Sequence, residues 1–140
     1  MFYYRKGSKY KNTKVTINGI TYDSKAEARR GRELEALEAA GEICGLRRQV
    51  KFTLIPAQYE YNGLYLRGPL KGEPKRGKLI ERECSYYADF VYTDKNGETI
   101  VEDVKGFETD SFKIKKKLML YVYGIRVQEI TIGRRKKNGR

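Results

Sequence analysis

The chain contains no histidine and no tryptophan, and only two cysteines and three prolines among its 140 residues. Without an imidazole, Ser-His-Asp triads, Cys-His nucleophiles and histidine-ligated zinc are excluded. Carboxylates, lysine, tyrosine and a bound metal ion remain as chemical groups. Cys44 and Cys84 show no C-x-x-C spacing, so we expect two buried thiols in a reducing cytosol.

Long apolar runs are also missing. No run approaches the roughly 18 residues of a membrane span, and the first 14 residues lack the apolar stretch of a signal peptide. We therefore expect a soluble, cytoplasmic protein with no membrane partner. The length fits a single domain over 1–140, and 12 tyrosines with 5 phenylalanines supply enough large side chains for a core.

Acidic residues are absent from both ends of a chain whose formal net charge is +12. The basic residues there are Arg5, Lys6, Lys9, Lys11 and Lys14 at one end and Arg134, Arg135, Lys136, Lys137 and Arg140 at the other. Phe2, Tyr3, Tyr4 and Tyr10 accompany the first group. Cationic side chains neutralise phosphates and aromatic rings stack on unpaired bases, so a basic aromatic arm (1–14) and a basic tail (133–140) predict a nucleic-acid partner. Solubilising tails, or contact with an acidic membrane surface, are the alternatives.

A third basic stretch lies inside the chain, at 67–82. Besides Arg67 at its start, it combines five basic residues with three glycines and two prolines, and those basic residues are Lys71, Lys75, Arg76, Lys78 and Arg82. Glycine and proline are typical of loops, so this segment predicts a basic flexible loop that clamps a substrate.

Turn and cap residues divide the chain into alternating elements. Asn18-Gly19 predicts a hairpin over 14–22, and Ser24 predicts a helix that ends at about Ala40. The later elements that we expect are a strand at 50–55, a small hairpin at 59–66 around Asn62-Gly63, strands at 86–93 and 98–105, a helix from Asp110 or Ser111 to about Tyr123, and a strand at 127–132. In the second helix we expect one buried stripe, made of Ile114, Leu118, Tyr121, Val122 and Ile125. This order predicts a mixed α/β domain.

Two aspartates stand out in the expected hairpin of 86–93 and 98–105. If its loop is 95–97, paired positions sum to 192, and Asp89 lies opposite Asp103 on one face of the sheet. Like charges so placed repel each other, and a divalent metal ion would relieve the repulsion. Lys105 projects from the same face as Asp103. The alternative is a cross-strand salt bridge without catalytic meaning.

Glu27 is a third candidate carboxylate, at the edge of the first helix stripe that faces the sheet. Ser24 and Glu27 also form a good capping box, in which Glu27 returns to the Ser24 backbone. Both interpretations stay open at this point. Gln49, just before the strand at 50–55, is either a residue that orients the site or a simple polar strand end.

Glu27, Asp89 and the Asp103-Val104-Lys105 motif together resemble the PD-(D/E)XK nuclease superfamily, over about residues 8–130. The resemblance implies a restriction-endonuclease-like core, with the order α-β-β-β-α-β and a mixed sheet flanked by helices. It implies Mg²⁺ or Mn²⁺ held by Asp89 and Asp103, by Glu27 directly or through water, and by the Val104 carbonyl. Lys105 would position water or stabilise the charge of the reacting phosphate. Ala88 departs from the pattern, where the motif has proline.

The resemblance also extends to small phage-encoded endonucleases, which implies a metal-dependent DNA endonuclease in a bacterial host cytoplasm. Selectivity for branched DNA or Holliday junctions, in phage recombination or replication, is an analogy with small basic relatives, and paired incisions would need a homodimer. The expected nucleic-acid contacts are Arg5, Lys6, Lys9, Lys11, Lys71, Lys75, Arg76, Lys78, Lys113, Arg134, Arg135, Lys136 and Lys137. The alternatives are a non-catalytic DNA- or RNA-binding protein and a ribosome-associated protein.

Overall fold

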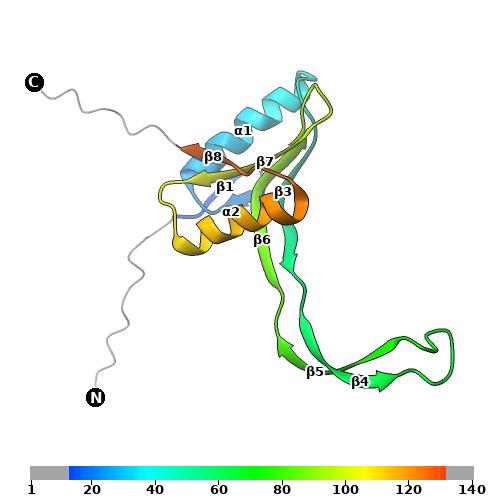
Figure 1. Cartoon of the computed structure of the whole chain (residues 1–140). Helices are drawn as coiled ribbons and strands as arrows, with labels where there is room; N and C mark the ends of the chain where they lie inside the picture. The colour runs from blue at the N-terminus through cyan, green and yellow to red at the C-terminus, as the bar shows by residue number, and fades with distance from the viewer. Residues whose placement is uncertain (1–12, 132–140) are drawn as a thin grey trace, which may run out of the picture.

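The structure is a computed structural model and describes residues 13–131 (Figure 1). Nearly all of the basic aromatic arm and all of the basic tail predicted from the sequence lie outside these residues. In chain order the elements are β1 (Val15–Ile17), β2 (Ile20–Tyr22), α1 (Lys25–Ala39), β3 (Cys44–Ile55), β4 (Gln58–Leu64), β5 (Pro74–Glu81), β6 (Cys84–Thr93), β7 (Thr99–Lys105), α2 (Asp110–Tyr123) and β8 (Gln128–Thr131).

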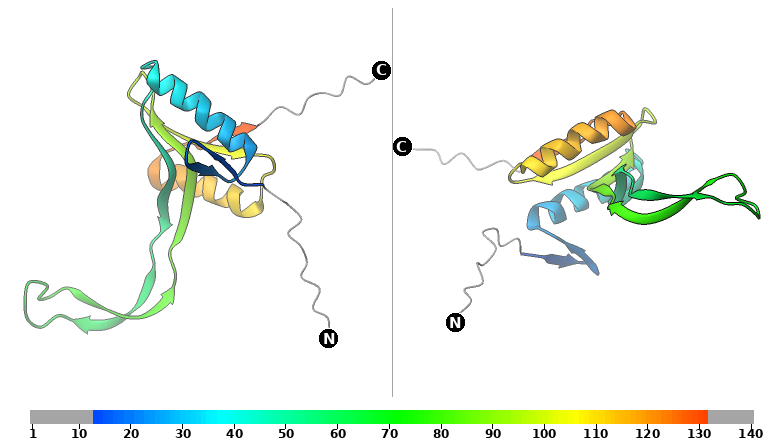
Figure 2. Two further views of the ribbon diagram at one scale, coloured as in Figure 1. Left: turned by 180° about the vertical axis from the view of Figure 1, so that it is seen from behind. Right: turned by 60° about the horizontal axis from the view of Figure 1, so that its bottom comes forward.

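A four-stranded mixed sheet forms the centre of the molecule, with the strand order β3-β6-β7-β8. β3, β6 and β7 are antiparallel neighbours, whereas β8 returns after α2 and runs parallel to β7. α1 and α2 lie on opposite faces of this sheet (Figure 2). The expected mixed α/β domain is therefore confirmed at the level of a mixed sheet with two helices.

Local sequence signals explain where the elements begin and end. Asn18 and Gly19 both adopt positive φ, 51° and 78°, and close the β1–β2 hairpin. Ser24 caps α1 by accepting a hydrogen bond from the Glu27 N–H, and Gly124 ends α2 in the left-handed conformation. The cap of α2 is Thr109, one residue before the predicted Asp110, because its hydroxyl accepts from the Phe112 N–H.

Each face of the sheet has its own apolar core. The α2 side buries Tyr86, Ala88, Val91, Val101, Phe112 and Met119, among others. The α1 side buries Tyr22, Ala28, Leu34, Phe90 and Tyr92, and the β1–β2 hairpin completes it. The sheet therefore lies between two apolar cores, one on each of its faces.

Two sequence predictions about apolar side chains were wrong. α2 buries Phe112 and Met119. Of the predicted stripe, Leu118 and Ile125 pack partly against the same core, whereas Ile114, Tyr121 and Val122 are exposed, Tyr121 at 88%. Apolar residues occur on most sides of this helix, so its sequence allows two stripes, and packing on the sheet selects the one with Phe112. Cys44 is exposed at the start of β3 and Cys84 is half-buried, so the pair of buried thiols is not observed either.

The largest difference from the sequence prediction is a long two-stranded ribbon. β3 and β6 are the base of a hairpin that β4 and β5 continue, and paired residues along the whole length sum to about 138. Asn62-Gly63 is therefore not a turn of a small hairpin, since the chain continues along β4 past it. The expected loop at 67–82 is a turn followed by a strand, because Pro74–Glu81 pairs with β4. We call residues 58–81 the β4–β5 arm, and Figure 1 shows it projecting from the sheet.

Candidate active site

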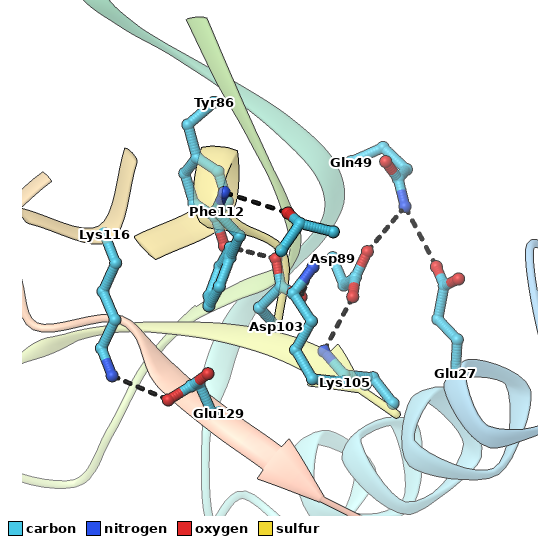
Figure 3. A network of polar contacts seen from close by, with 11 residues as sticks. Glu27, Gln49, Tyr86, Asp89, Asp103, Lys105, Phe112, Lys116 and Glu129 are labelled. Atoms are coloured by element: carbon cyan, nitrogen blue, oxygen red, sulfur yellow. Dashed lines mark hydrogen bonds and ion pairs between the residues drawn. The ribbon is translucent and has the colours of Figure 1, made fainter. Parts of the chain in front are cut away.

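The two candidate aspartates meet where β6 and β7 separate. The ladder between these strands runs from Thr93–Thr99 to Phe90–Glu102, and each pair sums to the predicted 192. Asp89 and Asp103 occupy the next position, at the point where the ladder ends. The register expected from the loop after Asp94 is thus confirmed, and it brings both carboxylates to one place (Figure 3).

Asp103 is almost fully buried, at 3% exposure. Its Oδ2 accepts a hydrogen bond of 2.8 Å from the Tyr86 hydroxyl, and its Oδ1 forms an ion pair of 2.8 Å with Lys105 Nζ. Within the described residues this buried Oδ1 has no hydrogen bond beyond that ion pair. The Lys105 ammonium also lies 4.2 Å from the centre of the Phe112 ring, which shields it from water on that side.

Asp89 bridges two strands with its carboxylate. Oδ2 accepts a hydrogen bond of 2.8 Å from the Val104 N–H, which in a regular ladder would donate to a backbone carbonyl. Oδ1 accepts from Gln49 Nε2 at 3.2 Å. Burial, together with the negative charges of Asp103 and Glu27, raises the pKa of Asp89 to about 7. The carboxylates therefore repel each other, and a positive charge between them would be stabilised.

Gln49 is a site residue whose importance sequence reasoning underestimated. Its φ of 49° is positive, which is uncommon for a residue with a side chain. The same Nε2 that reaches Asp89 also donates to Glu27 Oε1 at 3.0 Å. In the β3–β6 register, whose pairs sum to 138, Gln49 stands opposite Asp89. A prediction of that register would have revealed the contact.

Both strands change faces at Gln49 and Asp89. In a regular strand, residues two apart share a face. Arg48 nevertheless stacks on Tyr22 on the α1 side, at 4.0 Å, whereas Val50 packs on the α2 side. Ala88 and Phe90 divide between the two cores in the same way. The irregular backbone at this position lets side chains from both layers approach one point.

Glu27 performs the two tasks that the sequence left as alternatives. Oε2 accepts from the Asp23 N–H at 3.1 Å, one residue before the backbone group expected for a capping box. Oε1 accepts from Gln49 and lies 3.7 Å from the Arg48 guanidinium. Glu27 is buried at 3% exposure. It belongs to the site, but the Gln49 amide lies between it and Asp89.

The metal ligand set predicted from the sequence is only partly assembled. Between residues 13 and 131, no group of three or more acidic, histidine or cysteine side chains is placed to hold a metal ion. Asp89 and Asp103 still suit Mg²⁺, since this ion commonly uses one or two carboxylates and completes its shell with water. Their repulsion and the buried Asp103 Oδ1 without a hydrogen bond are the observations that fit a cation. Glu27 fits as a partner through water.

The reverse side of β7 carries a different arrangement around Glu102. Arg30 donates to both of its oxygens, from Nε at 2.8 Å and from Nη2 at 2.7 Å. The Tyr92 hydroxyl adds a third hydrogen bond at 2.6 Å, and burial raises the pKa of Tyr92 to about 12. Glu102 thus points away from Asp103, as alternation along a strand requires, and it ties α1 to β7.

The basic residues predicted to contact nucleic acid are distributed over several regions. Lys71, Lys75, Arg76 and Lys78 lie on the β4–β5 arm, and Lys113 is exposed on α2. The predicted contacts at 5–11 and 134–137 lie outside the described residues. None of these five predicted contacts is among the groups that bond to Asp89 or Asp103.

Comparison with known proteins gives one match. No curated protein and no solved structure matches the chain. Within the described residues, neither helix is long and apolar enough to cross a membrane. A sequence model built for a protein family matches residues 7–137, which is nearly the whole chain. The chain therefore belongs to the family described as "Protein of unknown function (DUF1064)".

Proposed function

We propose that this protein is a metal-dependent DNA endonuclease that hydrolyses phosphodiester bonds. The observation that carries the proposal is the meeting of Asp89, Asp103 and Lys105 where β6 and β7 separate, with one buried carboxylate oxygen lacking a hydrogen bond. The helix, three strands, helix and strand of the main layers support the further proposal of a restriction-endonuclease-like core.

In this proposal Asp89, Asp103 and the Val104 carbonyl would hold Mg²⁺, with Glu27 reaching it through water and Mn²⁺ as a substitute. The ion would supply charge neutralisation at the phosphate and a more acidic water molecule. Lys105 would exchange its ion pair with Asp103 for the phosphate or its water, and thereby stabilise developing negative charge.

Two neutral side chains would keep these groups in place. The Tyr86 hydroxyl donates to the Asp103 carboxylate and so orients it. The Gln49 amide donates to both Asp89 and Glu27 and so holds these two carboxylates near each other. Neither group changes charge at neutral pH, since burial and the nearby Asp103 raise the pKa of Tyr86. Both would hold the carboxylates in position while the metal ion, the water and the phosphate bind and leave.

A non-catalytic nucleic-acid-binding protein is the second candidate, whether for DNA or RNA. The incomplete metal cluster in residues 13–131 favours it. It predicts binding that survives EDTA, and it predicts that neutralising Asp103 leaves affinity unchanged or raises it. Selectivity for junction DNA and a homodimer for paired incisions remain part of the first proposal.

The test is cleavage of labelled duplex, single-stranded, flap and four-way-junction DNA in Mg²⁺, Mn²⁺ or EDTA. Asp103→Asn and Lys105→Ala should abolish metal-dependent cutting. The matched controls Glu98→Gln and Lys117→Ala, which make similar changes at exposed positions, should cut like the wild type. Tight binding without cutting in either metal would refute the nuclease and support the binding protein.

A further inference from the structure

The β4–β5 arm has no core of its own. Not one residue between 58 and 81 is buried, and the exposed side chains include Tyr61 at 69% and Leu66 at 78%. A two-stranded ribbon alone is marginally stable in water at best. The arm nevertheless keeps a defined pairing from Gln58–Glu81 to Leu64–Pro74. An ordered ribbon with two uncovered faces is typical of a surface that binds a partner.

The charges of the arm indicate the kind of partner. None of its basic side chains forms an ion pair with any described residue, and they are Arg67, Lys71, Lys75, Arg76 and Lys78. The rest of the described structure contains both kinds of cation: Lys51, Lys95 and Lys116 are each paired with a glutamate, whereas others, such as Arg29 and Lys117, are not. The arm therefore presents unneutralised cations, in excess of its three acids, to an anionic surface.

Aromatic rings hold two of these cations in place. The Arg76 guanidinium lies 4.8 Å from the centre of the Tyr59 ring, and Lys75 Nζ lies 5.4 Å from that of Tyr65. Arg76 also pairs with Tyr61 across the ribbon. A stacked guanidinium keeps its donors free for phosphate or base edges, and it loses less side-chain freedom when it binds.

We propose that the β4–β5 arm lies in the major groove of duplex DNA beside the cleaved phosphate. The major groove of B-form DNA is about 12 Å wide and admits a two-stranded ribbon. The major groove of A-form RNA is too deep and narrow for side chains to read, so the shape of the arm selects DNA. The exposed leucines near the turn would then meet the apolar thymine methyl groups and sugars of the groove.

The length of the arm sets the substrate that it requires. From Gln49 at the site to Leu66 near the turn, the strands have a contour of roughly 55 Å at about 3.3 Å per residue. The bend between β3 and β4 shortens the direct reach (Figure 2). At about 3.4 Å per base pair the arm reaches about one helical turn from the cleaved bond. The substrate is therefore DNA with a duplex of at least that length on one side of the cut.

This inference rests on the proposed function, and its test separates the two. Binding of 10- and 30-base-pair duplexes is measured in EDTA, and cleavage of the longer one is measured in Mg²⁺. The variant is Arg76→Ala/Lys78→Ala, which removes two exposed arm cations. The matched control, Arg32→Ala/Lys117→Ala, removes from α1 and α2 two exposed cations that form no ion pair with a described residue.

We expect the arm variant to bind the 30-base-pair duplex about 10- to 100-fold more weakly and to lower the salt slope of log K by about two. On the short duplex its affinity should equal that of the control. Its cleavage rate at saturating DNA should stay that of the wild type, since the residues around Asp103 are untouched. Circular dichroism of both variants would verify that they fold.

Equal binding of the long duplex by the variant and the control would overturn the arm proposal and leave the nuclease proposal standing. A change in oligomeric state without a change in DNA affinity would overturn it in favour of a second copy on the arm. Stronger binding to duplex RNA than to duplex DNA would also contradict it. An arm effect on binding without cutting by any form would support the arm and refute the nuclease.

Discussion

Glu102 and Asp103 are neighbours in the sequence and both are buried, but the protein treats them differently. Glu102 receives three hydrogen bonds, two of them from one guanidinium, so its charge is neutralised within the fold. Asp103 receives one hydrogen bond, at Oδ2. Its Oδ1 forms the ion pair with Lys105 and has no hydrogen bond in the described structure. Asp89 adds a further negative charge on that side only.

The comparison separates a structural acid, Glu102, from the acid that we propose to be functional, Asp103. A buried charge with a complete set of partners anchors two elements, here α1 and β7, and has no capacity for a ligand. A buried charge with fewer partners and a like charge beside it, as at Asp103, can still gain from a further cation in addition to Lys105. Substitutions on the two sides of β7 should therefore have opposite effects, on stability for Glu102 and on activity for Asp103.

Exchanging the two acids for amides should give the largest contrast. Asp103→Asn should lower the rate of Mg²⁺-dependent cleavage by about 10³-fold or more, since one charged ligand is lost. Its stability without metal should stay the same or rise. Glu102→Gln should keep most of the activity and unfold more easily, because Arg30 loses its charged partner. Cleavage rates and urea unfolding check both, and equal loss of activity in the two variants would contradict the distinction.

Removal of the guanidinium tests the structural side alone. Arg30→Ala leaves Glu102 buried without its ion pair, so the free energy of unfolding should fall by about 3 to 5 kcal/mol. Chemical denaturation measures the loss. The control is Arg29→Ala, an exposed arginine on the same helix, which should change stability by less than about 0.5 kcal/mol.

The pH dependence of stability tests the functional side. The folded-state pKa of Asp89, about 7, is above its ordinary value of 3.8, so the folded protein retains a proton that the unfolded chain loses. Without metal, the free energy of unfolding should therefore fall as pH rises from about 4 to 7. Relative to Asp89→Asn, the wild type should lose about 2 to 4 kcal/mol over that range.

Magnesium should reverse this trend above pH 7, since the ion binds the deprotonated carboxylates. Thermal unfolding with and without Mg²⁺, for the wild type and for Asp89→Asn, measures both effects. A wild type whose stability follows that of Asp89→Asn from pH 4 to 8 would show that Asp89 is not electrostatically unfavourable.

The smallest expected effect comes from removal of the Tyr86 hydroxyl, which donates to Asp103. Tyr86→Phe removes the hydrogen bond to Oδ2 and leaves that buried oxygen unpaired, so stability without metal should fall by about 1 to 2 kcal/mol. Tyr92→Phe is the counterpart on the other side. It should have the smaller effect, because Arg30 still satisfies Glu102. Denaturation curves of the two variants compare them, and a larger loss for Tyr92→Phe would contradict the comparison.

The parts of the fold that the sequence predicted depend on short-range chemistry. The turn after Asp94 defined the β6–β7 register, and that register alone brought Asp89 next to Asp103. Ser24 and Gly124 marked helix ends because caps involve only residues close in the chain. The position of Lys105 beside Asp103 followed from alternation along one strand.

The parts that could not be predicted depend on contacts between distant segments. Gln49 reaches Asp89 through an unusual backbone conformation and a strand pairing across forty residues. Asn62-Gly63 has the composition of a tight turn, but pairing with Pro74–Glu81 carries the strand past it. Tyr121 and Phe112 are both large aromatic residues of α2, and packing on the sheet buries only Phe112.

The long hairpin that runs from β3 to β6 also has a consequence for how the chain folds. Every pair in it closes around the same centre, near residue 69, so the ribbon can form by zipping from its turn toward the sheet. Each new pair then closes only a small additional loop, and the entropy lost per step is small. Zipping from the turn would therefore bring Gln49 opposite Asp89 without the closure of a large loop in one step.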